Sequence, residues 1–569
     1  MEKNGIFEKN LIALSGSNPA LCARLAKTQT AGNHYNFITA RTGELIPARI
    51  DEAGTARPLH STIDPRKEAR RLIEAEEGES FFIFLGLGAG FYAEAALEHD
   101  NTSMALVIEY DIKNLAELLS RLDYTRLFSD PRFTLTADLS DSELEAEILK
   151  LYRPVLCGGI RVIPLRSRTI FDTEAFTNAA KIISSAIEKV SADYSVQAHF
   201  GRRWFSNIIR NLLDMGDNPL PQPAVKKAAV TAAGPSLTLQ LRRILEKRKE
   251  VFLIATDTSL PCLLDAEIIP DAVISIDCQH ISYYHFMDGL PEGVPLFLDL
   301  ASPPLLASLS KDHHFLSCGH PLTSYISRSW KSLPELDSSG GNVTYAAVSL
   351  AEQLGAMEIE LYGADYSYPA GVTYAKGTYI YSFFAKRQNR LSPPEAQASA
   401  FLYRTPVEKK FKGNSFYYET NTLRFYREKL EKKAETMEAD LIPVEGRGAP
   451  IIIRKAKNSF IEKAGKVSLE ALNKTHHTNK KPLNPADFLL GYRNNVYRLP
   501  VPGKNAVEYL SLLKEEELAL FTSLLPLAAA LKHRYKASGG TGSREAAFGE
   551  LMEITKDHCI KEIDRILTQ

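Results

Sequence analysis

Hydrophobic and polar positions along the chain form two series in which short apolar runs alternate with helical patterns. The first series contains apolar runs at residues 81–85, 105–109, 133–136 and 160–163. The second contains runs at residues 228–232, 251–255, 272–276, 295–298, 315–317 and 358–362. Apolar strands separated by helices are typical of parallel sheets covered on both faces, so the pattern predicts an α/β protein with two Rossmann-like parallel-sheet domains.

Other patterns divide the chain. Residues 173–213 repeat apolar positions at helical spacing, with a possible break near Gly201, and the proline-rich stretch 217–223 predicts a boundary. Residues 35–44 resemble a β-hairpin, residues 384–406 a loop that folds over a pocket, and the Leu-, Lys- and Glu-rich tail a helical domain. We therefore predict an N-terminal Rossmann-like domain at 1–200, a central catalytic domain at 201–445 and a C-terminal helical domain at 446–569. The tail either docks an acceptor protein or only stabilises the fold.

Charge, apolar content and cysteine usage exclude several classes of function. The 569 residues carry a formal net charge of -1, so no global field attracts nucleic acid or an acidic membrane. No run of apolar residues is long enough for a membrane span, and the amino end does not resemble an export signal. The six cysteines form no CxxC pair, which predicts neither a zinc site nor a disulfide framework and favours a reducing cytoplasm.

The first domain contains a glycine turn of the nucleotide-binding type. Gly86, Gly88 and Gly90 follow an apolar strand and precede a helix, and Glu109 ends the next strand. Such glycines bring backbone close to a ligand, and the acid can accept a ribose hydroxyl. The alternative is that the turn serves only helix and strand packing.

The second domain places polar residues after successive strands, where parallel sheets bind ligands. Gly234, Pro235 and Ser236 follow the first strand and begin a helix whose free amides can hold a phosphate or a carboxylate. Later strand ends supply Asp257, Thr258, Asp277, Gln279, His280 and Asp365. A second helix start at Ser339, Gly340, Gly341 and Asn342 predicts another anion site, so the two turns together can grip a nucleotide.

Five short motifs carry a resemblance to a known family: Gly234-Pro235-Ser236-Leu237, Asp257-Thr258, Ser275-Ile276-Asp277, Gly340-Gly341-Asn342-Val343 and Tyr362-Gly363-Ala364-Asp365. Together they resemble the Maf, or motility-associated factor, family, whose central domain is similar to 6-hydroxymethylpterin pyrophosphokinase-like proteins and, more remotely, to bacterial sialyltransferases. The resemblance implies cytoplasmic transfer of a nonulosonic acid of the pseudaminic or legionaminic type from its CMP-activated form to Ser or Thr of flagellin. It implies no cofactor and no metal, and it leaves the oligomeric state open.

The resemblance leaves the catalytic base unassigned, because Tyr374 stands where the family has a histidine. His280 is our preferred base, with Asp277 and Asp365 as catalytic carboxylates, while His285 and His320 are further candidates. Two other functions stay open. In a pterin pyrophosphokinase-like enzyme, Asp257, Asp277 and Asp365 would hold Mg²⁺ and ATP phosphates. Alternatively, the chain is a flagellin-binding chaperone without catalysis.

Overall fold

The computed structural model describes residues 2–28, 34–50, 54–75, 80–99, 101–215, 225–454, 484–503, 505–538 and 548–568. By their contacts, the residues form two compact units. Unit 1 is Met1–Gly201 with Val496–Ile560, and unit 2 is Arg202–Asn495 with Lys561–Gln569. The three-domain division remains a prediction, since this grouping joins much of the tail to the first Rossmann-like part. The predicted boundary at 217–223 lies wholly outside the described residues.

Unit 1 contains the first predicted parallel sheet. Its strand order is β6-β5-β4-β7, with bounds β4 (Ser80–Leu85), β5 (Thr102–Glu109), β6 (Phe133–Ala137) and β7 (Gly159–Pro164). The predicted hairpin is confirmed as β1 (Tyr35–Thr39) paired antiparallel with β2 (Leu45–Ile50), which β3 (Ala56–Pro58) extends. Helices of this unit before residue 170 are α1 (Glu2–Ser15), α2 (Pro19–Lys27), α3 (Pro65–Glu74), α4 (Phe91–Glu98), α5 (Ile112–Leu119), α6 (Thr125–Phe128), α7 (Asp141–Leu151), α8 (Pro154–Cys157) and α9 (Arg166–Thr169).

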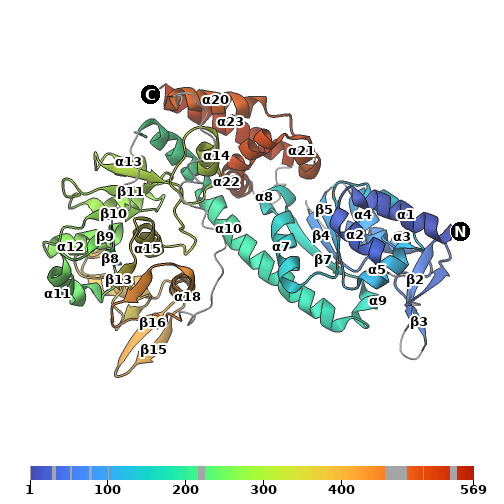
Figure 1. The fold of residues 1–569 in the computed structure, drawn as a ribbon, viewed down its shortest axis with the longest axis horizontal. Helices are drawn as coiled ribbons and strands as arrows, with labels where there is room; N and C mark the ends of the chain where they lie inside the picture. Colours follow the sequence, from blue (N-terminus) through green and yellow to red (C-terminus); the bar gives the residue numbers. More distant parts are fainter. Residues whose placement is uncertain are drawn as a thin grey trace. The chain divides into compact units, whose positions relative to one another are not determined.

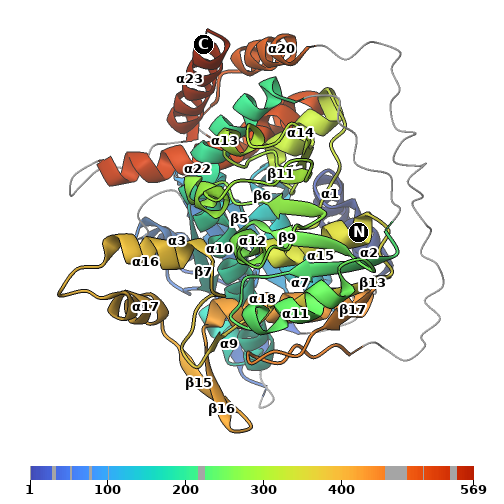
Figure 2. The ribbon, with the colours of Figure 1, turned by 90° about the vertical axis from the view of Figure 1, so that its left-hand side faces the viewer.

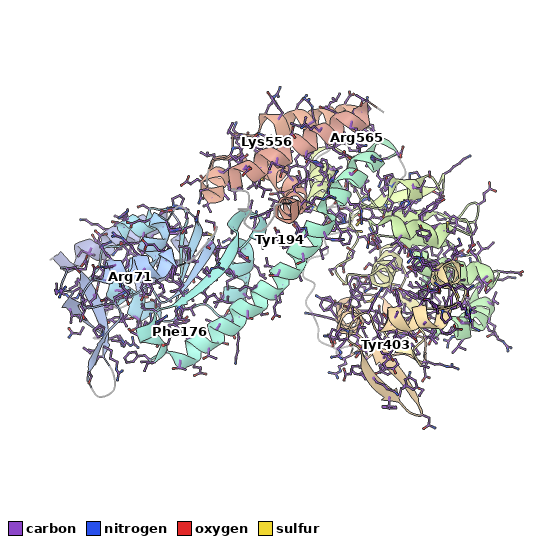
Figure 3. The ribbon with its side chains drawn as sticks, turned by 180° about the vertical axis from the view of Figure 1, so that it is seen from behind. Arg71, Phe176, Tyr194, Tyr403, Lys556 and Arg565 are labelled. Carbon is purple, nitrogen blue, oxygen red and sulfur yellow. The ribbon has the colours of Figure 1, made fainter. Side chains whose placement is uncertain are left out.

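Helix α10 (Thr173–Leu213) is continuous, so the predicted break near Gly201 is wrong. A Cβ at Gly201 would lie 1.8 Å from the carbonyl oxygen of Pro526. The glycine therefore permits the close approach of α22 (Glu515–Ser538), and it does not end the helix. Phe176, labelled on α10 in Figure 3, packs into the core on one face of the unit 1 sheet.

Unit 2 contains the second predicted parallel sheet. Its seven strands have the order β12-β11-β10-β9-β8-β13-β17. The bounds are β8 (Lys227–Thr231), β9 (Phe252–Thr256), β10 (Ala272–Ser275), β11 (Leu296–Asp299), β12 (His313–Leu316), β13 (Glu358–Tyr362) and β17 (Asp440–Pro443). The chain runs outward from β8 to β12 and then returns to β13 on the other side of β8, so the carboxyl ends of β8 and β13 mark a topological switch point.

Helices cover both faces of this sheet. Figure 1 shows α11 (Leu237–Lys247) and α12 (Leu260–Asp265) on one face and α15 (Val343–Gln353) on the other. The small side chains of α15 allow it to pack closely across β8, β9 and β10. Near the end of α10, the Asn207 side chain donates to the carbonyls of Cys278 and Ala301, which fixes the loops that follow β10 and β11.

The remaining elements of unit 2 include a helix where a loop was predicted. Residues 384–406 contain the end of α16 (Tyr379–Arg387) and all of α17 (Pro394–Leu402), because a proline in the first turn starts a helix as readily as it ends one. Three antiparallel strands follow the order β14-β16-β15. The other bounds are η1 (Asp257–Ser259), η2 (His280–Phe286), α13 (Pro304–Ala307), α14 (Pro321–Ser329), β14 (Tyr368–Pro369), β15 (Glu408–Lys412), β16 (Ser415–Glu419), α18 (Asn421–Thr436) and α20 (Pro485–Arg498).

The described part of the tail is helical, as predicted. Beyond α20 and α22 it contains α21 (Ala506–Leu512) and α23 (Phe548–Leu567). Within unit 1, Tyr509, Phe521 and Phe548 pack together and join the core of the parallel sheet. Among the residues that the structure describes, no helix is both long and apolar enough to cross a membrane.

Candidate functional site

Both predicted anion-binding turns lie at the carboxyl edge of the unit 2 sheet. The first turn follows β8 directly and leads into α11. Helix α15 leads into β13, which is parallel to β8, so α15 runs back toward the amino edge and begins at the carboxyl edge. The fold therefore places Gly234 and Gly340 at one edge of the sheet, with their helices on opposite faces.

The Gly234 turn is closed by the side chain of Asp365. The Ser236 amide donates to Asp365 Oδ2 at 2.8 Å, and the Ser236 hydroxyl donates to Asp365 Oδ1 at 2.5 Å. The Gly234 amide donates to the Gly363 carbonyl, and both Ser236 and Asp365 are buried. Burial raises the pKa of Asp365, and the hydrogen bonds from Ser236 oppose that rise. The Ser236 amide, expected to hold a phosphate or a carboxylate, thus donates to a carboxylate of the chain itself, so it is not free for a phosphate.

The Gly340 turn keeps unused amides. The Asn342 side chain caps α15 by accepting the Tyr345 amide at 3.0 Å, and the Ser339 amide donates to Asp337. Four backbone N–H groups of this turn have no acceptor among the described residues. They belong to Gly340, Asn342, Val343 and Thr344. Since a helix start with free amides attracts anions, α15 offers the better phosphate site of the two turns.

Two carboxylates lie at the same edge of the sheet, after β9 and β10. Asp257 is buried after β9, where its Oδ1 accepts the Thr258 amide at 2.6 Å and its Oδ2 accepts the Ser275 hydroxyl at 2.6 Å. Asp277 follows β10 and accepts the Gln279 amide at 2.8 Å. Asp277 is exposed as a residue, but the protein packed around its carboxyl group, together with the charge of Asp257, raises its pKa. These contacts hold both carboxylates at the predicted edge.

Aromatic and cationic side chains complete this group, and sequence reasoning missed two of them, Tyr379 and Arg404. Tyr379 interacts electrostatically with Arg404, Asp257 and Asp277, and its ring meets the His285 ring edge-on at 4.6 Å. Tyr374, the residue that replaces the expected histidine, interacts with Tyr379, Arg404 and Asp257. We call Asp257, Asp277, His285, Tyr374, Tyr379 and Arg404 the carboxyl-edge cluster. The loop predicted at 384–406 was the signal that pointed toward Arg404.

A histidine paired with a carboxylate lies at the ends of the neighbouring strands. His320 Nε2 donates to Asp299 Oδ2 at 2.8 Å, and the Trp204 ring packs against the imidazole at 4.6 Å. Burial acts to lower the pKa of His320, but the Asp299 carboxylate raises it above its usual value. Because Nε2 carries the donated proton, neutral His320 keeps a lone pair on Nδ1 and can accept a proton there.

His280, the base preferred from the sequence, has a different environment. It begins the short helix η2, its residue is exposed, and its ring stacks on Tyr283 at 6.0 Å. Among the described residues, no carboxylate forms an ion pair with it. The role of His280 as catalytic base remains a prediction, and His320 is an alternative candidate for the same role.

The glycine turn of unit 1 is filled by its own side chains. Glu109 accepts the Leu87 amide at 2.6 Å and pairs with buried Arg168 at 2.6 Å. His60 Nε2 accepts the Ala89 amide at 2.9 Å, and a Cβ at Gly88 would lie 2.4 Å from that nitrogen. At Gly90, a Cβ would lie 2.8 Å from Leu127, and at Gly86 it would touch Leu165 and Arg168. These contacts favour the packing alternative, because Glu109 is engaged and the glycines make room for protein atoms.

Acid is expected to weaken unit 1 through His60. Burial lowers the pKa of His60 to about 3 from its usual 6.5. Between these values the unfolded chain binds a proton that the folded chain does not, so stability is full above pH 6.5 and falls as the pH falls toward 3. From neutral pH to pH 5 the loss is about 2 kcal/mol. Calorimetric melting should show a smaller pH dependence in His60→Gln, which keeps an acceptor for Ala89, but an unchanged one in exposed His34→Gln. Equal pH dependence in all three proteins would contradict the assignment.

A large hollow in unit 2 lies away from the candidate site. A hollow of about 1020 Å³ lies at the amino edge of the unit 2 sheet, lined by Lys226, Lys227, Arg248, Lys249, Glu250 and Asp271 among others. Its charges are mixed, and Arg248 already pairs with Asp271. Parallel sheets bind ligands at the carboxyl edge, so we assign the candidate site by chemistry and topology there.

The three carboxylates proposed for Mg²⁺ do not come together. Asp365 is engaged with Ser236, whereas Asp257 and Asp277 lie in the carboxyl-edge cluster. Within the described ranges, no three His, Cys, Asp or Glu side chains are grouped so as to hold a metal ion. Burial also raises the pKa of the nearby Cys278 thiol to about 12, so that residue is no thiolate nucleophile.

Comparison with known proteins identifies similar sequences and a solved structure of similar fold. The model of the family described as 6-hydroxymethylpterin diphosphokinase MptE-like matches residues 204–371. Among solved structures, the MAf glycosyltransferase from Magnetospirillum magneticum AMB-1 is similar with a TM-score of 0.57 and 15% sequence identity. That match covers 100% of this chain and 96% of the glycosyltransferase, so the likeness of fold extends beyond the central domain.

Similar sequences occur in Treponema pallidum (strain Nichols). One uncharacterized protein is 31% identical over 167 residues, which are 29% of this chain and 80% of that protein. A second is 34% identical over 176 residues, which cover 30% of this chain and 62% of that protein. A third is 28% identical over 191 residues and is covered to 33% of its length. The similarity in sequence is thus confined to about a third of the chain.

Proposed function

Since this chain belongs to the MptE-like protein family and has the whole-chain fold of a Maf glycosyltransferase, we propose that it is a glycosyltransferase. The proposed donor is a CMP-activated nonulosonic acid of the pseudaminic or legionaminic type. The proposed acceptors are Ser or Thr hydroxyls of flagellin, so the reaction supports flagellar assembly and motility. The donor and acceptor rest on the family resemblance of the sequence motifs, and the transfer chemistry rests on the site.

One observation carries the proposal. A carboxylate-paired histidine, a helix start with unused amides and the carboxyl-edge cluster occur along a single edge of the sheet. Transfer of an activated sugar needs a group that accepts the hydroxyl proton and groups that stabilise the departing phosphate. This edge supplies both kinds of group.

The proposed step moves one sugar. The acceptor hydroxyl oxygen attacks the anomeric carbon of the donor, and the bond from that carbon to the phosphate oxygen breaks. The electron pair of that bond leaves with CMP, while the hydroxyl proton passes to Nδ1 of His320. The amides at the start of α15, with Arg404 and the tyrosine hydroxyls of the cluster, stabilise the added charge on the phosphate. Asp257 and Asp277 hold sugar hydroxyls, and the step requires no metal ion.

Two alternatives remain testable. The description of the matching family model favours a pterin diphosphokinase-like reaction, for which ATP binding would depend on Mg²⁺. The engagement of Asp365 with Ser236 argues against the metal site first predicted for it. A flagellin-binding chaperone would bind flagellin without binding any cytidine nucleotide.

The ligand experiment compares CMP, CDP, ATP with and without Mg²⁺, and S-adenosylmethionine by thermal shift. CMP at about 100 times its dissociation constant should stabilise the protein by about 2.7 kcal/mol. Val343→Pro tests the anion site, because it removes the first amide of α15 while Asn342 already has the extended backbone that proline requires before it. We expect this variant to bind CMP about 10-fold more weakly, which corresponds to about 1.4 kcal/mol.

The matched control is Asn421→Pro, which makes the same change at the start of α18, where Thr420 is also extended. It should bind CMP as the wild type does. Stabilisation by Mg-ATP and not by CMP would favour the diphosphokinase reaction. Flagellin binding without any nucleotide effect would favour the chaperone.

A further inference from the structure

A positively charged extension projects from unit 2. We call residues 368–419 the arm; it consists of β14, α16, α17, β15 and β16. Figure 2 shows α16, α17, β15 and β16 to one side of the parallel sheet of unit 2. Residues 368–419 contain eight Lys or Arg and three Glu, whereas the whole chain has a net charge of -1. The arm therefore carries a local field that attracts anionic groups.

Several cations of the arm are not neutralised. Lys386, Arg387, Arg390 and Lys409 form no ion pair with any residue that the structure describes. Arg387 lies 3.9 Å over the Phe383 ring, and Lys409 lies 4.2 Å over the Phe416 ring. By contrast, Lys410 pairs with Glu419. These four charges are thus available to a partner.

Apolar side chains are exposed among these cations. Leu391 is 93% exposed, Phe411 is 73% exposed and Tyr403, labelled in Figure 3, is 56% exposed. Large apolar side chains that are left open beside unpaired cations are typical of surfaces that bind a partner with both acidic and apolar groups.

The arm also has an open strand edge. β15 pairs with β16 on one side and, among the described residues, has no strand on its other side in the order β14-β16-β15. An edge strand offers backbone N–H and C=O groups to an extended polypeptide, which then adds to the sheet. A nucleic acid or a membrane surface does not use such groups in this way, so the open edge favours a polypeptide partner.

The arm is contiguous with the carboxyl-edge cluster. Tyr374, Tyr379 and Arg404 belong both to the arm and to the cluster, and Tyr379 interacts with Asp257 and Asp277. A chain lying along the arm would therefore have a path to the residues proposed for sugar transfer.

We propose that the arm binds an extended, acidic segment of the acceptor polypeptide, which adds to the edge of β15 and brings its hydroxyls to the carboxyl-edge cluster. This docking role rests on the proposed function, because delivering an acceptor hydroxyl is useful only to a transferase. Acidic side chains of the segment meet Lys386, Arg390 and Lys409, and its apolar side chains cover Phe411 and Leu391.

Peptide binding by the full chain tests the proposal. The probe is a fluorescein-labelled peptide of alternating Glu and Val, measured by anisotropy at low and at physiological ionic strength. The variant Lys386→Glu/Arg390→Glu/Lys409→Glu should bind it about 10-fold more weakly or worse. The matched control, Lys226→Glu/Lys249→Glu/Lys311→Glu, makes the same change of charge at exposed lysines outside the arm and should bind as the wild type does. Equal loss in both variants would overturn the proposal.

A second probe tests strand addition without altering the protein. The same peptide, N-methylated at alternate residues, lacks backbone donors along one edge and should bind the wild type about 10-fold more weakly. Undiminished binding would overturn the strand-addition part. Stronger arm-dependent binding of single-stranded DNA or of vesicles containing phosphatidylserine would overturn the choice of a polypeptide.

Hydrolysis of the activated sugar separates this proposal from the proposed function. The arm variant should release CMP from the donor to water at the wild-type rate, because water needs no docking surface. If the wild type neither binds nor hydrolyses the donor but still binds the peptide through the arm, the transferase proposal fails and the docking surface stands.

Discussion

His320→Gln is expected to slow glycosyl transfer by about 10²- to 10⁴-fold, the usual contribution of a general base, while CMP affinity stays unchanged. Glutamine can still donate to Asp299, but it has no lone pair that accepts a proton at neutral pH. The buried Asp299 carboxylate and the Trp204 ring fix the imidazole, so little other structure should change. Single-turnover transfer of the labelled sugar to flagellin, with CMP binding measured in parallel, checks this expectation.

The pH dependence of the transfer rate distinguishes a catalytic base from a residue that only stabilises the fold, because a structural residue would not change it. Because Asp299 raises the pKa of His320, the base is protonated in acid and transfer should rise with pH through a pKa above the usual histidine value. Asp299→Asn removes the charge and should shift this rise to lower pH. The contribution of the charged His320–Asp299 pair to folding stability depends on pH in the opposite direction from the transfer rate. It is present at low pH and is lost as the pH rises through the folded-state pKa.

The comparison variant is His280→Gln, since His280 was the base preferred from the sequence. If His320 is the base, His280→Gln should retain nearly full transfer, because the His280 ring stacks on Tyr283 and, in the part of the chain that the structure describes, pairs with no carboxylate. Loss of transfer in His280→Gln together with full activity in His320→Gln would return the role to His280.

The sequence predicted the two sheets because their strands are apolar runs bounded by glycine or proline turns. The run at Phe81–Leu85 consists of five consecutive apolar residues and predicts a buried strand, and β4 includes all of it. By contrast, β17 was not predicted, because it has four residues and an acidic start, and it is a strand only because β13 lies beside it. The error at Gly201 has a similar cause: the carbonyl of Pro526, distant in sequence, decides what that glycine does.

The residues of the candidate site could also be predicted only in part. A rule of the fold identified the strand ends, so Asp257 and Asp277 could be named from sequence spacing alone. What each side chain contacts could not be named, because Ser236 and Asp365 are 129 positions apart and their hydrogen bond exists only after the sheet forms. Arg404 was missed for that reason as well: the stretch 384–406 was predicted to fold over a pocket, but nothing in it singles out the residue that reaches the sheet edge.

Arg168→Met is expected to destabilise unit 1 by about 3–5 kcal/mol, because it leaves a buried carboxylate without its partner. Glu109 and Arg168 are both almost completely buried and lie 2.6 Å apart. The double variant Arg168→Met/Glu109→Gln should recover a large part of the loss, since the amide oxygen of glutamine can still accept the Leu87 amide without a charge. Calorimetric melting measures both changes, and the exposed pair of Arg126 with Glu98 supplies a control in which Arg126→Met should cost less than about 1 kcal/mol. If the double variant melts no higher than Arg168→Met, the arginine stabilises unit 1 by filling the crevice beside Gly86, and charge compensation is not the cause.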